Sequence, residues 1–179
     1  MKEISARYSK EIIRKAENIR AIFCDVDGVL SDGKIIYDAD GKELKAFNVK
    51  DGQIIKHLKK ENIIVGIISG RESKSVSVRA VELKLDFCHQ GILDKAATFE
   101  KLIKHYQLKA KEVAFIGDDI NDLPVLRKVG LSVCPADTFE YIKQEVDLVT
   151  FAKGGKGVLR EVADMILAAK GKMEKIIKS

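Results

Sequence analysis

Short apolar runs alternate along the chain with longer segments in which apolar residues recur every three to four positions. The runs have the length of buried strands and stop at polar loops, whereas the longer segments have the period of amphipathic helices. Strands are expected at residues 21–24, 63–68, 86–89, 113–116, 131–134 and 148–151, and helices at residues 9–18, 52–61, 73–83, 95–106, 123–129, 139–144 and 158–169. This alternation predicts an α/β protein, a Rossmann-like three-layer α/β/α sandwich whose crossovers place helices on both faces of a mostly parallel sheet.

The segment 33–48 interrupts this alternation and predicts a projecting β-hairpin. Its two strand-like stretches flank Asp40 and Gly41, a dipeptide typical of tight turns. The length of 179 residues suits a single domain over residues 1–179, with an N-terminal helix within residues 1–19. The tail after Gly171 is expected to fray.

The polar residues that follow the apolar runs make up one chemical set, because ligands of a parallel sheet bind where the carboxyl ends of its strands meet. The set comprises Asp25, Asp27, Ser69, Arg71, Lys95, Asp118, Asp119 and Asp122. So many carboxylates would repel one another or take up protons unless a divalent cation lay among them, and Mg²⁺ suits a site that also binds phosphate. A turn or capping role explains Asp119 or Asp122 alone, but not two acidic clusters that both end strands.

This set predicts phosphate transfer through a covalent intermediate. Asp25, held at the end of a strand, is the candidate nucleophile, and Asp27 is the candidate general acid and base. The Lys95 ammonium would offset phosphoryl charge, and the Ser69 hydroxyl would hold phosphoryl oxygens. Taken alone, Lys95 reads as a surface lysine and Ser69 as part of a turn, so the combination carries the prediction.

Composition excludes several other classes of protein. The net charge is +5, but no basic run or aromatic-rich stripe is present, which argues against nucleic-acid binding. The three cysteines, Cys24, Cys88 and Cys134, are an odd number at wide spacing, as expected of reduced thiols. The charged N-terminus and the lack of a long apolar stretch predict a cytoplasmic protein that does not contact membranes.

Four segments resemble the motifs of the haloacid dehalogenase superfamily, in its phosphatase branch. They are residues 25–30, residues 69–71, Lys95 and residues 117–122. Residues 32–33, 47–52, 90–91 and 154–162 resemble more closely the capless subgroup that contains the 3-deoxy-D-manno-octulosonate 8-phosphate (KDO 8-phosphate) phosphatase family. The similarity covers nearly the whole chain after the first helix.

The resemblance implies a role for each motif residue. Mg²⁺ would be held by the Asp25 carboxylate, the Asp27 backbone carbonyl and Asp118, with Asp119 and Asp122 near the metal. The subgroup has no cap domain and forms homotetramers, in which a neighbouring subunit covers the active site. The hairpin at residues 33–48 would be the oligomerisation element, since an isolated hairpin needs a partner surface.

The resemblance also implies a substrate, KDO 8-phosphate, whose hydrolysis yields KDO for lipopolysaccharide biosynthesis. The candidates for binding its anionic sugar acid are Lys50, Arg71, Arg79 and Lys156. Lysine stands at 50 and 156 where the family often has arginine, and lysine lacks the planar fork that grips a carboxylate.

Three alternatives remain open at this point. The first is a sister phosphatase that acts on a nonulosonate (KDN or N-acylneuraminate) 9-phosphate. The second is a phosphoacceptor signalling domain, which usually lacks an acid two residues after the nucleophile, so Asp27 argues against it. The third is a catalytically inactive interaction module, which is disfavoured because every motif position is retained.

Overall fold

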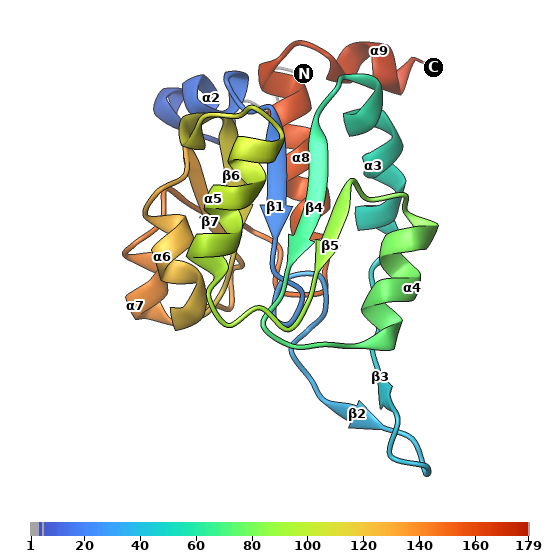
Figure 1. Cartoon of the computed structure of the whole chain (residues 1–179). Helices are drawn as coiled ribbons and strands as arrows, with labels where there is room; N and C mark the ends of the chain where they lie inside the picture. Colours follow the sequence, from blue (N-terminus) through green and yellow to red (C-terminus); the bar gives the residue numbers. More distant parts are fainter. Residues whose placement is uncertain (1–3, 5, 179) are drawn as a thin grey trace.

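The computed structural model describes residue 4 and residues 6–178, and a six-stranded parallel sheet forms its centre (Figure 1). The strand order is β5-β4-β1-β6-β7-β8, and each neighbouring pair runs parallel. The strands are β1 (Ala21–Cys24), β4 (Ile64–Ile68), β5 (Phe87–His89), β6 (Val113–Ile116), β7 (Leu131–Cys134) and β8 (Leu148–Val149). The chain winds outward in opposite directions from β1, so a crevice opens between the ends of β1 and β6.

Helices cover both faces of this sheet (Figure 1). One face carries α2 (Lys10–Glu17), α3 (Val49–Lys60), α4 (Lys74–Glu82), α8 (Val158–Ala169) and α9 (Met173–Ile177). The other carries α5 (Lys95–His105), α6 (Leu123–Leu126) and α7 (Glu140–Lys143), with short 3₁₀ helices at Ala110–Glu112 and Ile120–Asp122. Successive side chains of a strand point to opposite faces, so β1 supplies Ile22 and Cys24 to the first core and Phe23 to the second. The predicted three-layer α/β/α sandwich is confirmed.

Most predicted elements are found, and the differences lie at their ends. β1, β6, β7 and α8 match their predicted bounds. The expected helix at residues 123–129 is shorter, because α6 ends at Leu126. In the N-terminal segment 1–19 the described helix is α2, capped by the Ser9 hydroxyl, while residues 1–3 and 5 lie outside the described residues.

The tail after Gly171 was expected to fray, but its described residues, 172–178, include a helix, and residue 179 lies outside the described residues. The chain turns at Gly171 and forms α9, whose first residue, Met173, is 3% exposed and packs into the first core. A buried methionine side chain anchors this short helix, which its highly charged sequence does not reveal.

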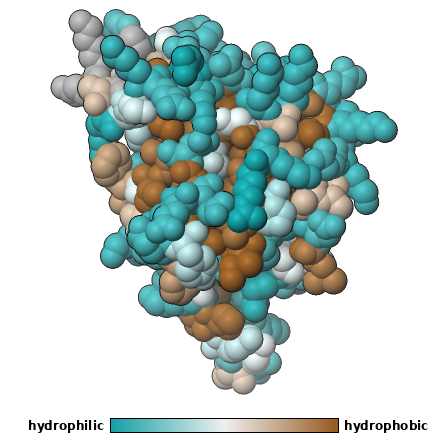
Figure 2. Space-filling model, turned by 90° about the vertical axis from the view of Figure 1, so that its left-hand side faces the viewer, coloured by the Kyte–Doolittle hydropathy of each residue, from teal (hydrophilic) through white to brown (hydrophobic). Residues whose placement is uncertain are grey.

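The interrupting segment forms the predicted hairpin, with β2 (Ile36–Tyr37) paired antiparallel to β3 (Glu43–Leu44). The hairpin projects beyond the carboxyl ends of the sheet strands (Figure 1). Figure 2 shows apolar side chains (brown) near the projecting end of the molecule, and the exposed apolar residues of the hairpin are Ile35, Ile36, Tyr37 and Leu44. Within the described ranges, every helix is too short or too polar to span a lipid bilayer.

Candidate active site

The loops that follow β1, β4 and β6 enclose a cavity of about 250 Å³ at the edge of the sheet. The cavity is lined by Asp25, Asp27, Gly28, Gly33, Ser69, Gly70, Arg71, Asp118, Asp119 and Asn121. Apolar strands that end in polar loops therefore bring the predicted residues of three motifs into one space, as expected for a parallel sheet.

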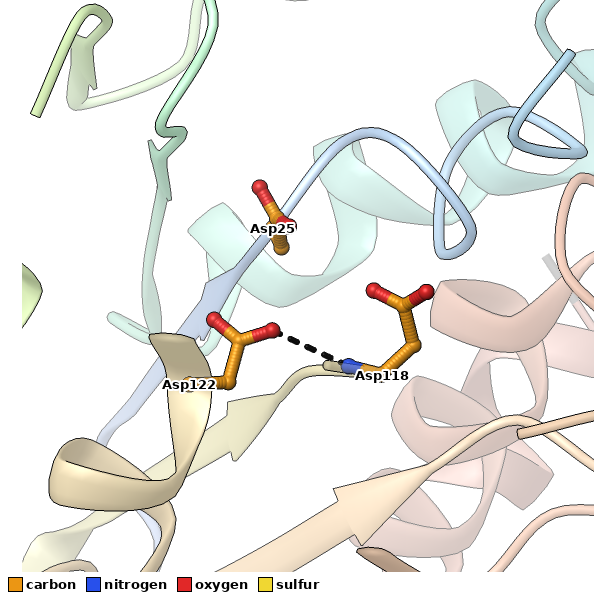
Figure 3. A group of neighbouring side chains, drawn as sticks. All are labelled: Asp25, Asp118 and Asp122. Carbon is orange, nitrogen blue, oxygen red and sulfur yellow. Dashed lines mark hydrogen bonds between the residues drawn. The ribbon is translucent and has the colours of Figure 1, made fainter. Parts of the chain in front are cut away.

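Three carboxylates form the centre of this site. One oxygen from each of Asp25, Asp118 and Asp122 lies within 4.8 Å of the others. Figure 3 shows Asp25 at the end of β1, opposite Asp118 and Asp122 on the loop and 3₁₀ helix that follow β6. The Asp122 carboxylate accepts hydrogen bonds from the backbone N–H groups of Asp118 (3.0 Å) and Asp119 (3.3 Å). Asp122 therefore fixes the loop that carries Asp118.

Lys95 links the two sides of the carboxylate cluster. Its ammonium lies 3.0 Å from Asp25 Oδ2 and donates a hydrogen bond of 2.7 Å to Asp122 Oδ1. The Lys95 side chain is 0% exposed. A fully buried ammonium is stable only when paired, so this lysine belongs to the site rather than to the surface.

Burial and like charges raise the carboxylate pKa values. Burial, followed by the charge of Asp122, raises the pKa of Asp25 to about 6, although Lys95 opposes this rise. Burial, followed by the charges of Asp25 and Asp122, raises the pKa of Asp118 to about 8. Burial alone would lower the pKa of Lys95, but Asp122 and Asp25 outweigh it and the pKa is raised, so the ammonium stays charged. The site therefore holds more negative charge than one lysine balances.

The arrangement fits a hard divalent cation. Asp25 Oδ1 and Asp118 Oδ1 are buried and accept no hydrogen bond. Gly28, at φ +82°, brings its backbone so close that an added Cβ would lie 1.9 Å from Asp118 Oδ2. Free carboxylate oxygens in a close backbone cradle are the ligands that Mg²⁺ prefers, and such an ion would relieve the repulsion between them.

Asp27 lines the same cavity but has a different environment. Its Oδ1 accepts a hydrogen bond from the Ser31 hydroxyl (3.3 Å) and forms an ion pair with Lys45. The Arg71 Nε lies 3.7 Å from Oδ2. Asp27 is separate from the Asp25–Asp118–Asp122 cluster, as a group that exchanges protons with substrate and water needs to be.

Of the four predicted substrate-binding residues, one lines the cavity of this chain. Arg71 lines the cavity, but Lys50, Arg79 and Lys156 are not among the described residues that line it. Lys50 is exposed near the start of α3. Arg79 pairs with Glu82 on α4 and donates a hydrogen bond to the Asn48 carbonyl.

The sequence analysis missed two kinds of residue in the site. Asn121 lines the cavity, and its position inside the motif at residues 117–122 was a signal for it. Lys45 and Glu43 reach the site from the hairpin. Side chains two residues apart in an extended segment lie on the same face, which the sequence indicates. Only the fold shows that this face contacts Asp27.

Comparisons with known proteins agree with this geometry. Residues 85–162 match a family of haloacid dehalogenase-like hydrolases. The chain is 45% identical, over 92% of its length and 88% of the relative, to 3-deoxy-D-manno-octulosonate 8-phosphate phosphatase from Yersinia pestis. It is 45% identical to the Escherichia coli enzyme of the same name, over 93% of the chain and 88% of that relative.

A solved structure is similar over almost the full length. The 3-deoxy-D-manno-octulosonate 8-phosphate phosphatase from Moraxella catarrhalis, in complex with magnesium ion, phosphate ion and KDO, superposes with a TM-score of 0.92. The two sequences are 38% identical, and the match covers 96% of this chain and 98% of the Moraxella catarrhalis chain. Fold and site together define a haloacid dehalogenase-like hydrolase. Within that class, the chain belongs to the 3-deoxy-D-manno-octulosonate 8-phosphate phosphatase family.

Proposed function

We propose that the protein is a Mg²⁺-dependent phosphatase that hydrolyses KDO 8-phosphate to KDO and inorganic phosphate, a step toward lipopolysaccharide. The observation that carries this proposal is the Asp25–Asp118–Asp122 cluster with buried Lys95, at the crevice between β1 and β6 where the winding of the sheet changes direction. Full-length similarity to enzymes of that name supports the substrate.

In the proposed reaction, Asp25 attacks the phosphorus atom and forms an aspartyl phosphate as the bond to the sugar oxygen breaks. The Asp25 and Asp118 carboxylates and the Asp27 backbone carbonyl would hold Mg²⁺, which offsets the negative charge of the phosphoryl oxygens. Lys95, whose ammonium lies 3.0 Å from Asp25 Oδ2, would contribute a second positive charge, and the buried Ser69 hydroxyl would bind a phosphoryl oxygen.

Asp27 would carry the protons of both half-reactions. In the first it donates a proton to the leaving sugar oxygen, and in the second it takes a proton from the water that attacks the aspartyl phosphate. Each turnover thus consumes one water and returns Asp25 and Asp27 to their starting states. Asp27 lines the same cavity as Asp25, so both carboxyl groups can reach a phosphate ester bound there.

The sugar-acid end of the substrate would bind Arg71 at the mouth, and Lys50, Arg79 and Lys156 in an assembled oligomer. We propose a homotetramer in which hairpins of neighbouring subunits pack through Ile35, Ile36, Tyr37 and Leu44, all of them exposed in the single chain. Three free cysteines, two of them buried, support a cytoplasmic location.

Phosphate release from a panel of sugar phosphates tests the proposal. We expect Mg²⁺-dependent turnover of KDO 8-phosphate, abolished by EDTA, and a loss of at least about 1,000-fold for Asp25→Asn, because the amide is not a nucleophile. Glu100→Gln, a change on an exposed surface, serves as the control and is expected to keep full activity. A preference for a nonulosonate 9-phosphate would reassign the substrate, and labelling without release would favour the signalling domain.

A further inference from the structure

The two faces of the hairpin strand β3 have different surroundings. Leu44 points outward and is 48% exposed. Glu43, on the opposite face, and Lys45, the residue after β3, turn toward the active site, and the Lys45 side chain is only 1% exposed. A lysine in a projecting hairpin is normally solvated, so its burial beside Asp27 requires a specific partner.

Lys45 is held by two carboxylates at once. Its ammonium forms an ion pair with Asp27 Oδ1 and lies 2.8 Å from Glu43 Oε1. Arg71 closes the network, since its guanidinium donates a hydrogen bond of 3.1 Å to Glu43 Oε2. Ordering a long lysine side chain costs conformational entropy, so a buried and doubly paired lysine is a defined structural contact.

This network distinguishes the two oxygens of Asp27. Oδ1 is anchored by Lys45 and by the Ser31 hydroxyl. Oδ2 is buried and accepts no hydrogen bond, although the Arg71 Nε lies 3.7 Å away. An anchored Oδ1 restrains the carboxyl group and leaves Oδ2 as the oxygen without a hydrogen-bond partner.

We propose that Lys45 is a positioning residue that holds Asp27 by Oδ1, with Glu43 keeping Lys45 in place, so that Oδ2 meets the leaving oxygen. The inference rests on the proposed function, because it assigns the proton transfer to Asp27. It makes the hairpin part of each subunit's own active site, in addition to any role in assembly.

The test compares leaving groups, because an alkyl leaving oxygen needs a proton and an aryl one hardly does. In Lys45→Met, kcat/KM for KDO 8-phosphate is expected to fall about 10–100-fold, and for para-nitrophenyl phosphate less than about threefold. The value of kcat/KM reports the steps up to phosphoryl transfer to Asp25, which precede the hydrolysis of the aspartyl phosphate by water. KM for KDO 8-phosphate should change little, and Lys45→Arg should recover part of the loss. Lys42→Met, an exposed lysine of the same hairpin, is the matched control and should behave as wild type.

A double-mutant cycle decides whether Lys45 acts through Asp27. In an Asp27→Asn background, Lys45→Met is expected to cause less than about a twofold further loss, since residues that act as a unit are not additive. Equal losses for both substrates, or additive losses in the cycle, would mean that Lys45 binds phosphate or only supports the fold, and would overturn the proposal. A wild type that hydrolyses neither ester would instead refute the proposed function. The retained activity on the aryl ester shows that the variant is folded.

Discussion

At the scale of single residues, the site concentrates charge that the protein alone does not neutralise. Folding raises the pKa of Asp118 from 3.8 to about 8, first by burial and then through Asp25 and Asp122. A carboxyl group with a raised pKa contributes its stability at low pH, and that contribution is lost as the pH rises through the folded value. The metal-free protein therefore becomes less stable between about pH 4 and pH 8 on account of this group.

The variant Asp118→Asn removes that titration. In EDTA, its free energy of unfolding relative to wild type is expected to increase by about 1–3 kcal/mol between about pH 5 and pH 8, after allowing for screening. Urea unfolding followed by circular dichroism measures this difference. Asp40→Asn, an exposed carboxylate in the hairpin turn, is the control. A difference between Asp118→Asn and wild type that does not change with pH would contradict the account of the cluster.

At the scale of elements, α3 supplies the cap that α8 lacks. The residue before α8 is Gly157, at φ +98°, which has no side chain to accept a hydrogen bond. Instead, the buried Asp51 of α3 accepts a 2.7 Å hydrogen bond from the Arg160 backbone N–H in the first turn of α8. A carboxylate at a helix N-terminus also interacts favourably with the helix dipole. This contact fixes the glycine-rich loop before α8 next to the site.

Two replacements of Asp51 should distinguish the contribution of its hydrogen bond to stability from the contribution of its negative charge. Asp51→Ala is expected to lower the free energy of unfolding by about 1–2 kcal/mol, because the Arg160 N–H loses its acceptor. Asp51→Asn keeps an acceptor oxygen and should cost less. Chemical denaturation of both variants at neutral pH, with Mg²⁺ present, checks the order. An asparagine variant as unstable as the alanine variant would show that the hydrogen bond does not account for the effect.

At the scale of the whole molecule, the hairpin exposes apolar side chains that a single chain does not cover. Ile36 and Leu44 are cross-strand partners in its ladder, and they are 46% and 48% exposed. An apolar pair on a two-stranded hairpin is stable only against another surface. The active-site mouth lies at the base of the same hairpin, so assembly would cover both features together.

The double variant Ile36→Asp and Leu44→Asp tests this packing. It is expected to convert the proposed tetramer to smaller species, because buried charges would replace apolar contacts at the proposed interface. Light scattering coupled to size exclusion gives the mass, and far-ultraviolet circular dichroism checks that the sheet and helices persist. The Lys42→Met variant should keep the wild-type mass. A monomeric wild type, or an unchanged mass in the double variant, would refute the proposed interface.

Much of this organisation is local and was predictable from the chain. The strands β1, β6 and β7 were predicted because each is a short apolar run, buried along its whole length, that ends at a polar loop. The meeting of Asp25 and Asp118 followed, since parallel strands share one carboxyl edge. Local pattern is less informative for a short helix that is held by tertiary contacts, as α9 is by Met173 and Ile176.

The sheet, its helices and the crowding of carboxylates at one edge were predictable from the chain alone, because each depends on periodicity and on where apolar runs stop. The partner of each polar group was not predictable in this way and became known from the folded structure. That structure placed Lys45 on Asp27, Lys95 between Asp25 and Asp122, and kept Arg79 out of the cavity lining. These pairings join segments that are distant along the chain, and they depend on how far each side chain reaches across packed elements, a distance that no local pattern encodes.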